Sequence, residues 1–97
     1  MKIKWTRPAQ RDLRKAVEYI VEDSPMAAKS MSQRIRHASL MLAEHPGMGR
    51  PGRVKGTREL IVPGLPFTLP YREKGGAIEI LRVMHTSRKW PNNLPES

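Results

Sequence analysis

The sequence contains no cysteine, which excludes disulfide bonds and thiol catalysis. Aromatic residues make up only 5% of it, so it offers few of the platforms on which single-stranded nucleic-acid binders stack bases. No window is apolar over the length of a membrane span, and residues 1–5 lack the apolar core of a signal peptide. We therefore expect a cytoplasmic protein with no membrane partner.

Acidic residues are also scarce. Nine Asp and Glu stand against 18 Lys and Arg in 97 residues, which gives a formal net charge of +9. This excess suggests an anionic partner, and charge alone does not choose among nucleic acid, an acidic protein segment and a membrane surface. The length predicts one domain, which we place at residues 1–91, followed by a polar, flexible C-terminal tail at 92–97.

The first half of the sequence predicts a short strand and a pair of helices. Residues 2–6 alternate between polar and apolar side chains, as in a strand. Thr6 can cap a helix over residues 8–22, and Ser24 can cap a second helix that ends near Glu44. An apolar seam in steps of three and four suits the second helix to pack along the first as an antiparallel hairpin. The seam consists of Ala28, Met31, Ile35, Ala38 and Leu42.

The second half predicts three strands, over residues 57–62, 67–73 and 77–85, joined by glycine-containing turns. The expected fold class is therefore α+β, in the order β-α-α-β-β-β. The helical hairpin would pack on one face of a small, mostly antiparallel sheet. Pro70 cannot donate a hydrogen bond to a neighbouring strand, so we expect a bulge or irregular pairing at that point.

Alternation along the last strand makes a further prediction about Arg82. It places Arg82 on the same face as Ile78 and Ile80, and Val83 on the other face. Arg82 would then be either buried against a carboxylate such as Glu59 or exposed to a ligand, because a guanidinium group suits both carboxylate and phosphate oxygens.

The sequence shows no cofactor or metal motif, and we expect neither group. Residues 47–52 match G-x-G-x-x-G, but they follow a helix and precede a strand, which is the wrong order for a dinucleotide-binding loop. His37, His45 and His85 lack metal-ligand spacing. His85, at a strand end, could act as a general acid or base, although a hydrogen-bonded structural histidine is the favoured interpretation.

Several short segments carry a family resemblance through their order and spacing. They are HPGMGRPG (residues 45–52), GTREL (56–60), PYR (70–72) and ILRVMHTSRKWP (80–91), with WTRPA (5–9) and DL (12–13) in the helical half. Together they resemble the ParE branch of the RelE/ParE toxin superfamily. The resemblance implies the toxin of a type II toxin–antitoxin module, in a hetero-oligomer with a small antitoxin whose acidic C-terminal segment folds on binding.

The resemblance implies two alternative activities. ParE-like members inhibit DNA gyrase and stall it on cleaved DNA, without catalysis of their own. RelE-like members cut mRNA on the ribosome without a metal, and usually carry an arginine on the middle strand. Thr68 stands in its place here, and threonine cannot stabilise phosphate charge as a guanidinium does, which favours the gyrase inhibitor. A nuclease would instead use His85 on the ribose 2′-hydroxyl, with Arg88 and Arg58 on the scissile phosphate.

The cations that would bind a partner are concentrated in the second half of the sequence. They are Arg50, Arg53, Arg58, Arg72, Arg82 and Lys89. A solvated basic surface is an equally good interpretation of the same residues. A third function is also compatible with the sequence, namely a basic module that binds an antitoxin after its toxic activity has decayed.

Overall fold

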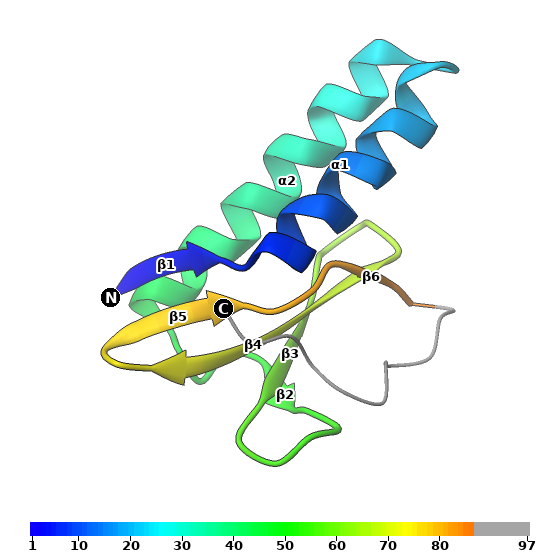
Figure 1. The fold of residues 1–97 in the computed structure, drawn as a ribbon. Coiled ribbons are helices and arrows are strands. Elements are labelled where there is room, and N and C mark those ends of the chain that lie inside the picture. The colour runs from blue at the N-terminus through cyan, green and yellow to red at the C-terminus, as the bar shows by residue number, and fades with distance from the viewer. Residues whose placement is uncertain (87–97) are drawn as a thin grey trace.

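Two helices cover one face of a β-sheet (Figure 1). The computed structural model describes residues 1–86, so the predicted domain end at residue 91 and the predicted tail lie outside the described residues. The elements are β1 (Lys2–Trp5), α1 (Arg7–Val21), α2 (Pro25–Glu44), β2 (Arg50–Pro51), β3 (Arg58–Ile61), β4 (Phe67–Lys74), β5 (Ala77–Ile80) and β6 (Met84–His85). The predicted α+β class is confirmed. The short strand β2 replaces part of a predicted loop, and the predicted last strand is divided into β5 and β6.

Both helices begin at the predicted caps. The Thr6 hydroxyl oxygen accepts a hydrogen bond from Ala9 N at 3.2 Å, and that of Ser24 accepts one from Ala27 N at 3.1 Å. Each cap is followed by a proline in the first turn, where a missing N–H leaves no helical bond unmade. The Thr6 hydroxyl also donates to the Ile80 carbonyl oxygen at 3.0 Å, which fastens the start of α1 to the end of β5.

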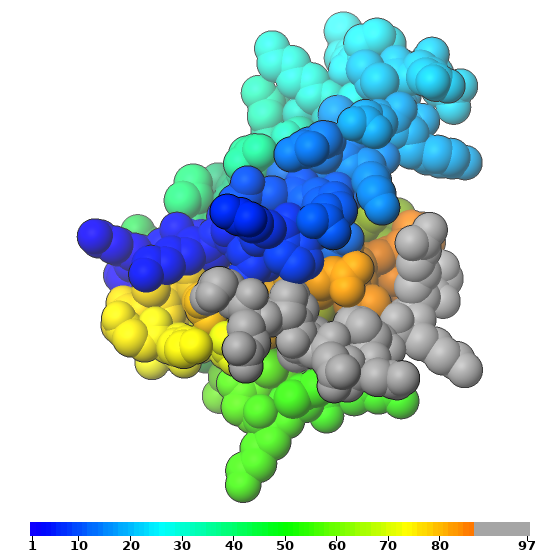
Figure 2. Space-filling view, viewed as in Figure 1, coloured from blue at the N-terminus to red at the C-terminus, as the bar shows by residue number. Residues whose placement is uncertain are grey.

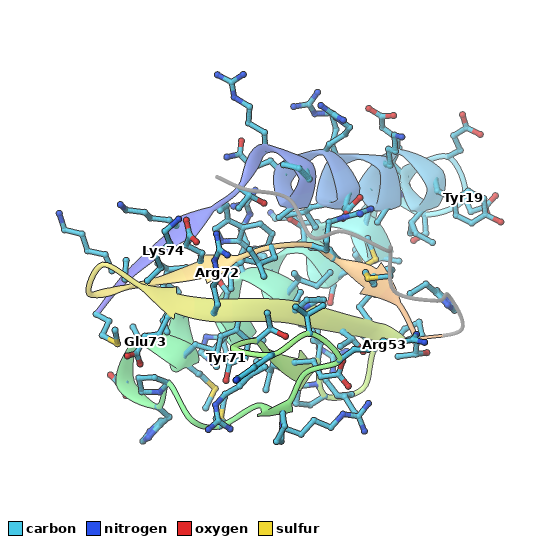
Figure 3. The ribbon with its side chains drawn as sticks, turned by 60° about the horizontal axis from the view of Figure 1, so that its bottom comes forward. Tyr19, Arg53, Tyr71, Arg72, Glu73 and Lys74 are labelled. Atoms are coloured by element: carbon cyan, nitrogen blue, oxygen red, sulfur yellow. The ribbon has the colours of Figure 1, made fainter. Side chains whose placement is uncertain are left out.

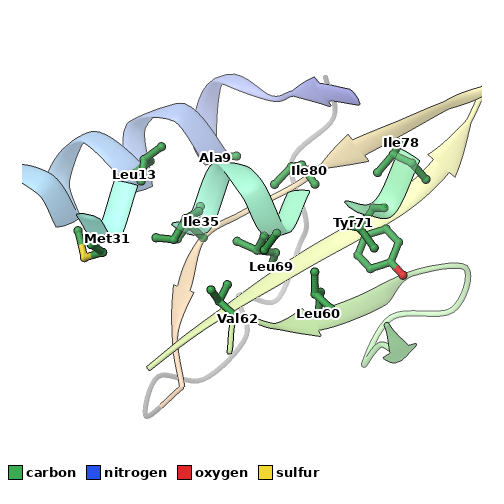
Figure 4. Close-up of a cluster of buried hydrophobic side chains, with 13 residues drawn as sticks. Ala9, Leu13, Met31, Ile35, Leu60, Val62, Leu69, Tyr71, Ile78 and Ile80 are labelled. Carbon is green, nitrogen blue, oxygen red and sulfur yellow. The ribbon is translucent and has the colours of Figure 1, made fainter. Parts of the chain in front are cut away.

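The core lies between α2 and the sheet (Figure 4). All five residues of the predicted seam on α2 are buried, which confirms the packing face of this helix. Ile35 and Leu42 are fully buried, as are Leu69 of β4 and Ile80 of β5 on the facing sheet. Burying a side chain of this size contributes about 1.5–3 kcal/mol, so this layer supplies much of the driving force for folding.

The sheet has the strand order β1-β5-β4-β3-β2, and β6 also pairs with β4. β1 runs parallel to β5, with Ile3 opposite Ile78, whereas every other pairing among the described strands is antiparallel. A parallel neighbour requires a long crossover connection, which the helical hairpin begins. β5, paired with β1 on one side and β4 on the other, therefore joins the N-terminal strand to the strands of the second half.

A β-bulge lies opposite Pro70, where irregular pairing was predicted. Tyr71 of β4 pairs with Ile80, whereas Thr68 pairs with Met84. Between these two pairs, β4 has two residues and the facing chain has three, so one extra residue shifts the alternation. Val83 consequently joins Ile80 in the core. The prediction that Val83 lies on the opposite face from Ile80 is wrong, because it assumed an unbroken strand.

Candidate functional site

Tyr71 fixes the connection between α2 and the sheet. Its side chain is only 1% exposed, and its hydroxyl donates to the Pro46 carbonyl oxygen at 2.7 Å and accepts from Gly49 N at 2.8 Å. Burial raises the pKa of this phenol above its usual value, and the hydrogen bond from Gly49 partly opposes that effect. The two hydrogen bonds anchor residues 46–49 before the chain enters β2.

Arg50 and Arg58 are positioned directly beside this anchor. The Arg58 guanidinium donates from Nη1 to the Gly49 carbonyl oxygen at 2.9 Å. Arg50 Nε lies 2.6 Å from Glu59 Oε1, and the two residues are also opposite each other in the β2–β3 pairing. The structure therefore brings together two of the predicted partner-binding cations, although each already has a partner within the chain.

Arg53 lies in the turn between β2 and β3 and is exposed. Figure 3 shows it well away from Arg72 and Lys74. Arg72 belongs to the centre of the sheet, where its Nε donates to Glu79 Oε1 at 2.7 Å. The Glu79 side chain is nearly fully buried, so this ion pair neutralises a carboxylate that would otherwise be costly to bury. Arg72 therefore has a structural role, which is to pair with the buried carboxylate of Glu79.

Arg82 joins the end of β5 to the first helix. Its Nε and Nη2 donate to the two carboxylate oxygens of Asp12 at 2.6 and 3.1 Å, and Val83 N donates to the same carboxylate at 3.0 Å. The hydrogen bond to Asp12 raises the pKa of Arg82, which stays protonated. Arg82 does pair with a carboxylate, but the expectation of Glu59 is wrong, because Glu59 pairs with Arg50 across β2 and β3.

The residues of the predicted nuclease site are not gathered in the described part of the chain. Arg58 is opposite Tyr71, and His85 is opposite Phe67 on the other side of β4. These two positions are four residues apart along β4, or about 13 Å at the rise of a strand. The His85 ring packs edge-on against Phe67, with ring centroids 5.7 Å apart. Arg88, the third member, and Lys89 lie outside the described residues.

Two residues that the sequence did not mark as functional organise these cations. Tyr71 anchors the connection that carries Arg50, and Asp12 holds Arg82. Asp12 could have been noticed as the lone acid among Arg7, Arg11 and Arg14 in the first turns of a basic helix. Its partner is 70 residues away, however, and no local pattern indicates which cation it meets.

A groove of about 480 Å³ runs between α1 and α2. Leu13 and Val17 contribute apolar surface to it, and Arg14 and Arg36 contribute positive charge. The Arg36 guanidinium lies 5.8 Å from the centre of the Trp5 ring, in a cation–π contact that holds one wall of the groove. Glu18 also lines the groove, so charges of both signs border its apolar surface, an arrangement that suits an amphipathic segment.

Residues 1–86 contain no group of three or more His, Asp or Glu side chains arranged to hold a metal ion. Among the same residues, neither helix combines the length and the apolar character that crossing a bilayer requires.

Comparisons with known proteins agree with one another. Residues 3–90 match the family model described as the ParE toxin of the type II toxin–antitoxin system, parDE. The chain is 45% identical over 93 residues, or 96% of each protein, to Y4kP of Sinorhizobium fredii, which is named as a candidate toxin. It is 34% identical to Toxin RelE2 of Caulobacter vibrioides, over 87% of this chain and 93% of that protein.

A solved structure, described as the chromosomal ParDE TA system from P. aeruginosa, contains a chain of the same fold. The two chains superpose with a TM-score of 0.79 at 38% sequence identity, over 88% of this chain and 95% of the other. The match extends over both the helical hairpin and the sheet, and the family model covers almost the whole sequence. The chain therefore belongs to the ParE toxin family of type II toxin–antitoxin systems, within the RelE/ParE superfamily.

Proposed function

We propose that this toxin inhibits DNA gyrase and is neutralised by a cognate antitoxin. The observation that carries the proposal is the match of residues 3–90 to the ParE toxin family model. The similarity to a chain of a ParDE system, at 38% identity, supports the same branch. No catalytic residue is required, because a gyrase inhibitor of this type acts by binding.

The surroundings of Thr68 weigh against the nuclease alternative. Thr68 occupies the place where RelE-like toxins usually carry an arginine, and its side chain is buried rather than exposed to a substrate. Arg58 donates a hydrogen bond to a backbone carbonyl and Arg82 donates to Asp12, so each guanidinium group already has a partner within the chain. A metal-independent nuclease needs a cation on the scissile phosphate together with an acid or base near the ribose.

The test is a supercoiling assay with purified gyrase, relaxed plasmid and ATP. Increasing amounts of the purified toxin should suppress supercoiling or accumulate linear DNA after denaturation of the trapped complexes. A matched reaction with no gyrase should leave the plasmid unchanged. Normal supercoiling at a large molar excess of folded toxin contradicts the proposal.

The nuclease alternative is tested on the same preparation. Translating ribosomes are incubated with the toxin, and the mRNA ends are mapped by primer extension. Intact mRNA is the expected result. Cleavage that is abolished by His85→Ala or Arg88→Ala, with unchanged circular dichroism, would replace the gyrase proposal with the nuclease. Growth that continues normally on expression without an antitoxin would favour the decayed module.

The positive charge and the interhelical groove support an acidic antitoxin as the partner. A net charge of +9 speeds the encounter with an acidic segment, and the groove offers apolar contacts flanked by Arg14 and Arg36. The candidate antitoxin is the product of the adjacent reading frame. Copurification in a defined hetero-oligomer, with loss of gyrase inhibition, is the expected outcome, and continued inhibition in the presence of saturating partner contradicts it.

A further inference from the structure

The turn between β2 and β3 is closed by its own hydrogen bonds. Gly52 N donates to the Thr57 carbonyl oxygen at 2.8 Å, and Thr57 N donates to the Val54 carbonyl oxygen at 3.1 Å. The Thr57 hydroxyl donates to that same carbonyl. Gly56 has φ +83°, a left-handed conformation that favours glycine. The turn therefore has a defined shape before it meets any partner.

The base of this hairpin is equally well fixed. Gly49 is held by Tyr71 on one side and by Arg58 on the other. A Cβ atom at Gly49 would lie 2.6 Å from Tyr71 Cε1 and 2.8 Å from the Glu59 carbonyl oxygen, which shows how closely the chain approaches the sheet. Fixing both the base and the turn means that little conformational entropy is lost when the hairpin binds.

Two cations project from the turn without an ion-pair partner among residues 1–86. Arg53 and Lys55 are exposed, and no carboxylate of residues 1–86 pairs with either of them. In this they differ from Arg50, Arg72 and Arg82, each of which has a carboxylate partner. Two like charges separated only by Val54 repel each other, and a bound anion would relieve that repulsion.

The shape of the hairpin favours phosphates over an acidic peptide. Figure 2 shows this part of the chain, in green, protruding at the bottom of the molecule, on the side away from the helices. An extended peptide needs a groove or a free strand edge, but β2 has only two residues and one of them is Pro51, which has no N–H to donate. A protruding pair of cations can reach the phosphates of duplex DNA, which lie on its outer surface.

We infer that the β2–β3 turn, residues 52–57, is a DNA contact in which Arg53 and Lys55 bind backbone phosphates of a duplex. The inference deepens the gyrase proposal and rests on it for its biological meaning, since gyrase acts on DNA. The contact is independent of sequence, because phosphate contacts position a protein on DNA without reading bases. Binding to DNA itself can be measured without gyrase.

The experiment measures binding of the full-length toxin to a fluorescent duplex of about 20 base pairs by anisotropy, at a series of NaCl concentrations. Each phosphate contact contributes about 0.9 to the slope of log K against log salt concentration. Replacing both cations, Arg53→Gln with Lys55→Gln, should therefore lower the magnitude of the slope by about 1.8. The affinity advantage of the wild type over this variant should then shrink roughly tenfold between 50 and 200 mM salt.

A matched variant removes the same charge elsewhere. Arg11 and Lys15 are exposed on α1, on the opposite side of the sheet from the hairpin. Arg11→Gln with Lys15→Gln should leave the slope nearly unchanged. An unaltered slope in the hairpin variant, or equal losses in both variants, overturns the inference in favour of diffuse electrostatic attraction. Both variants should keep the wild-type urea midpoint, which shows that they are folded. Lys55→Gln alone provides a second measurement, because it should lower the magnitude of the slope by about half as much as the double variant does.

The remaining outcomes separate the partners and the two proposals. If the hairpin variant loses affinity for a labelled polyglutamate peptide but keeps the DNA slope, the surface binds an acidic peptide and the DNA inference is wrong. If the wild type shows the predicted slope but does not inhibit gyrase, the gyrase proposal fails while the DNA contact stands. If the wild type inhibits gyrase normally but the hairpin variant retains the wild-type salt slope, the DNA contact is wrong while the gyrase proposal stands.

Discussion

Removing a single oxygen atom from Tyr71 tests whether the connection after α2 is anchored as described. Tyr71→Phe keeps the buried ring but deletes the hydroxyl that bridges Pro46 and Gly49. The Gly49 N–H is then left without a partner in a buried place, which costs about 1–3 kcal/mol. The Pro46 carbonyl is only half-buried and can partly rehydrate, so the total should be about 2–3 kcal/mol.

That loss is large for a domain of this size, whose stability is expected to be roughly 5–10 kcal/mol. It should lower the melting temperature by roughly 10–20 °C and shift the urea midpoint with an unchanged m value. The matched control is Tyr19→Phe, because Tyr19 is 79% exposed and should tolerate the change within about 0.5 kcal/mol. Equal effects of the two substitutions, or a Tyr71→Phe effect below about 0.5 kcal/mol, would refute the anchoring role.

The pH dependence of stability gives an independent check on the same residue. Burial raises the pKa of Tyr71 in the folded state above its unfolded value near 10.0. The neutral phenol is thus favoured by folding, so its contribution is fully present below about pH 10 and is lost as the pH rises through the folded pKa. Above about pH 10 the wild type should lose more stability with rising pH than Tyr71→Phe, in which only the other titrating groups remain.

Three further substitutions test other contacts by urea denaturation. Gly49→Ala should lower the free energy of unfolding by about 1–3 kcal/mol, because the added Cβ would collide with Tyr71 and the Glu59 carbonyl oxygen. Gly47→Ala is the control and should be nearly neutral, because a Cβ there has nothing within 4 Å. Similar losses of stability in the two variants would contradict the close approach at Gly49. Asp12→Asn should cost about 1–3 kcal/mol by weakening the paired hydrogen bonds to Arg82, and an unchanged midpoint would show that the contact is unimportant. Ala38→Asp should cost several kcal/mol because it buries an unpaired charge in the α2 seam, and undiminished stability would refute that packing.

The helices were predictable because their signals are local. Thr6 and Ser24 cap them as expected, and the seam on α2 is buried because its spacing matches the helical repeat. The strands predicted at residues 57–62 and 67–73 were also found, with ends displaced by at most one residue, whereas the predicted strand at 77–85 is interrupted after residue 80 and β2 was missed. The pairing of the strands was harder to predict from the sequence, since β1 pairs in parallel with β5 and no short sequence window contains both segments.

The candidate site was predictable in residue type but not in arrangement. Its arginines were identified, yet the partner of Arg82 was not, because Asp12 approaches it only after α1 has packed on the sheet. The irregularity at Pro70 followed from its missing N–H, but its consequence for Val83 did not, because the extra residue lies in the facing chain. Each error arose where contacts between distant segments override a local periodicity.

The pairing of the first strand with β5 also affects the order in which the protein can acquire its shape. β1 is complete at Trp5, but β5 ends at Ile80, so the first segment made must wait for nearly the whole chain before it gains a neighbour. At a synthesis rate of about 5–20 residues per second, that delay is roughly 4–15 s. During this interval the nascent chain lacks its finished sheet, so the folded toxin cannot form before synthesis is nearly complete.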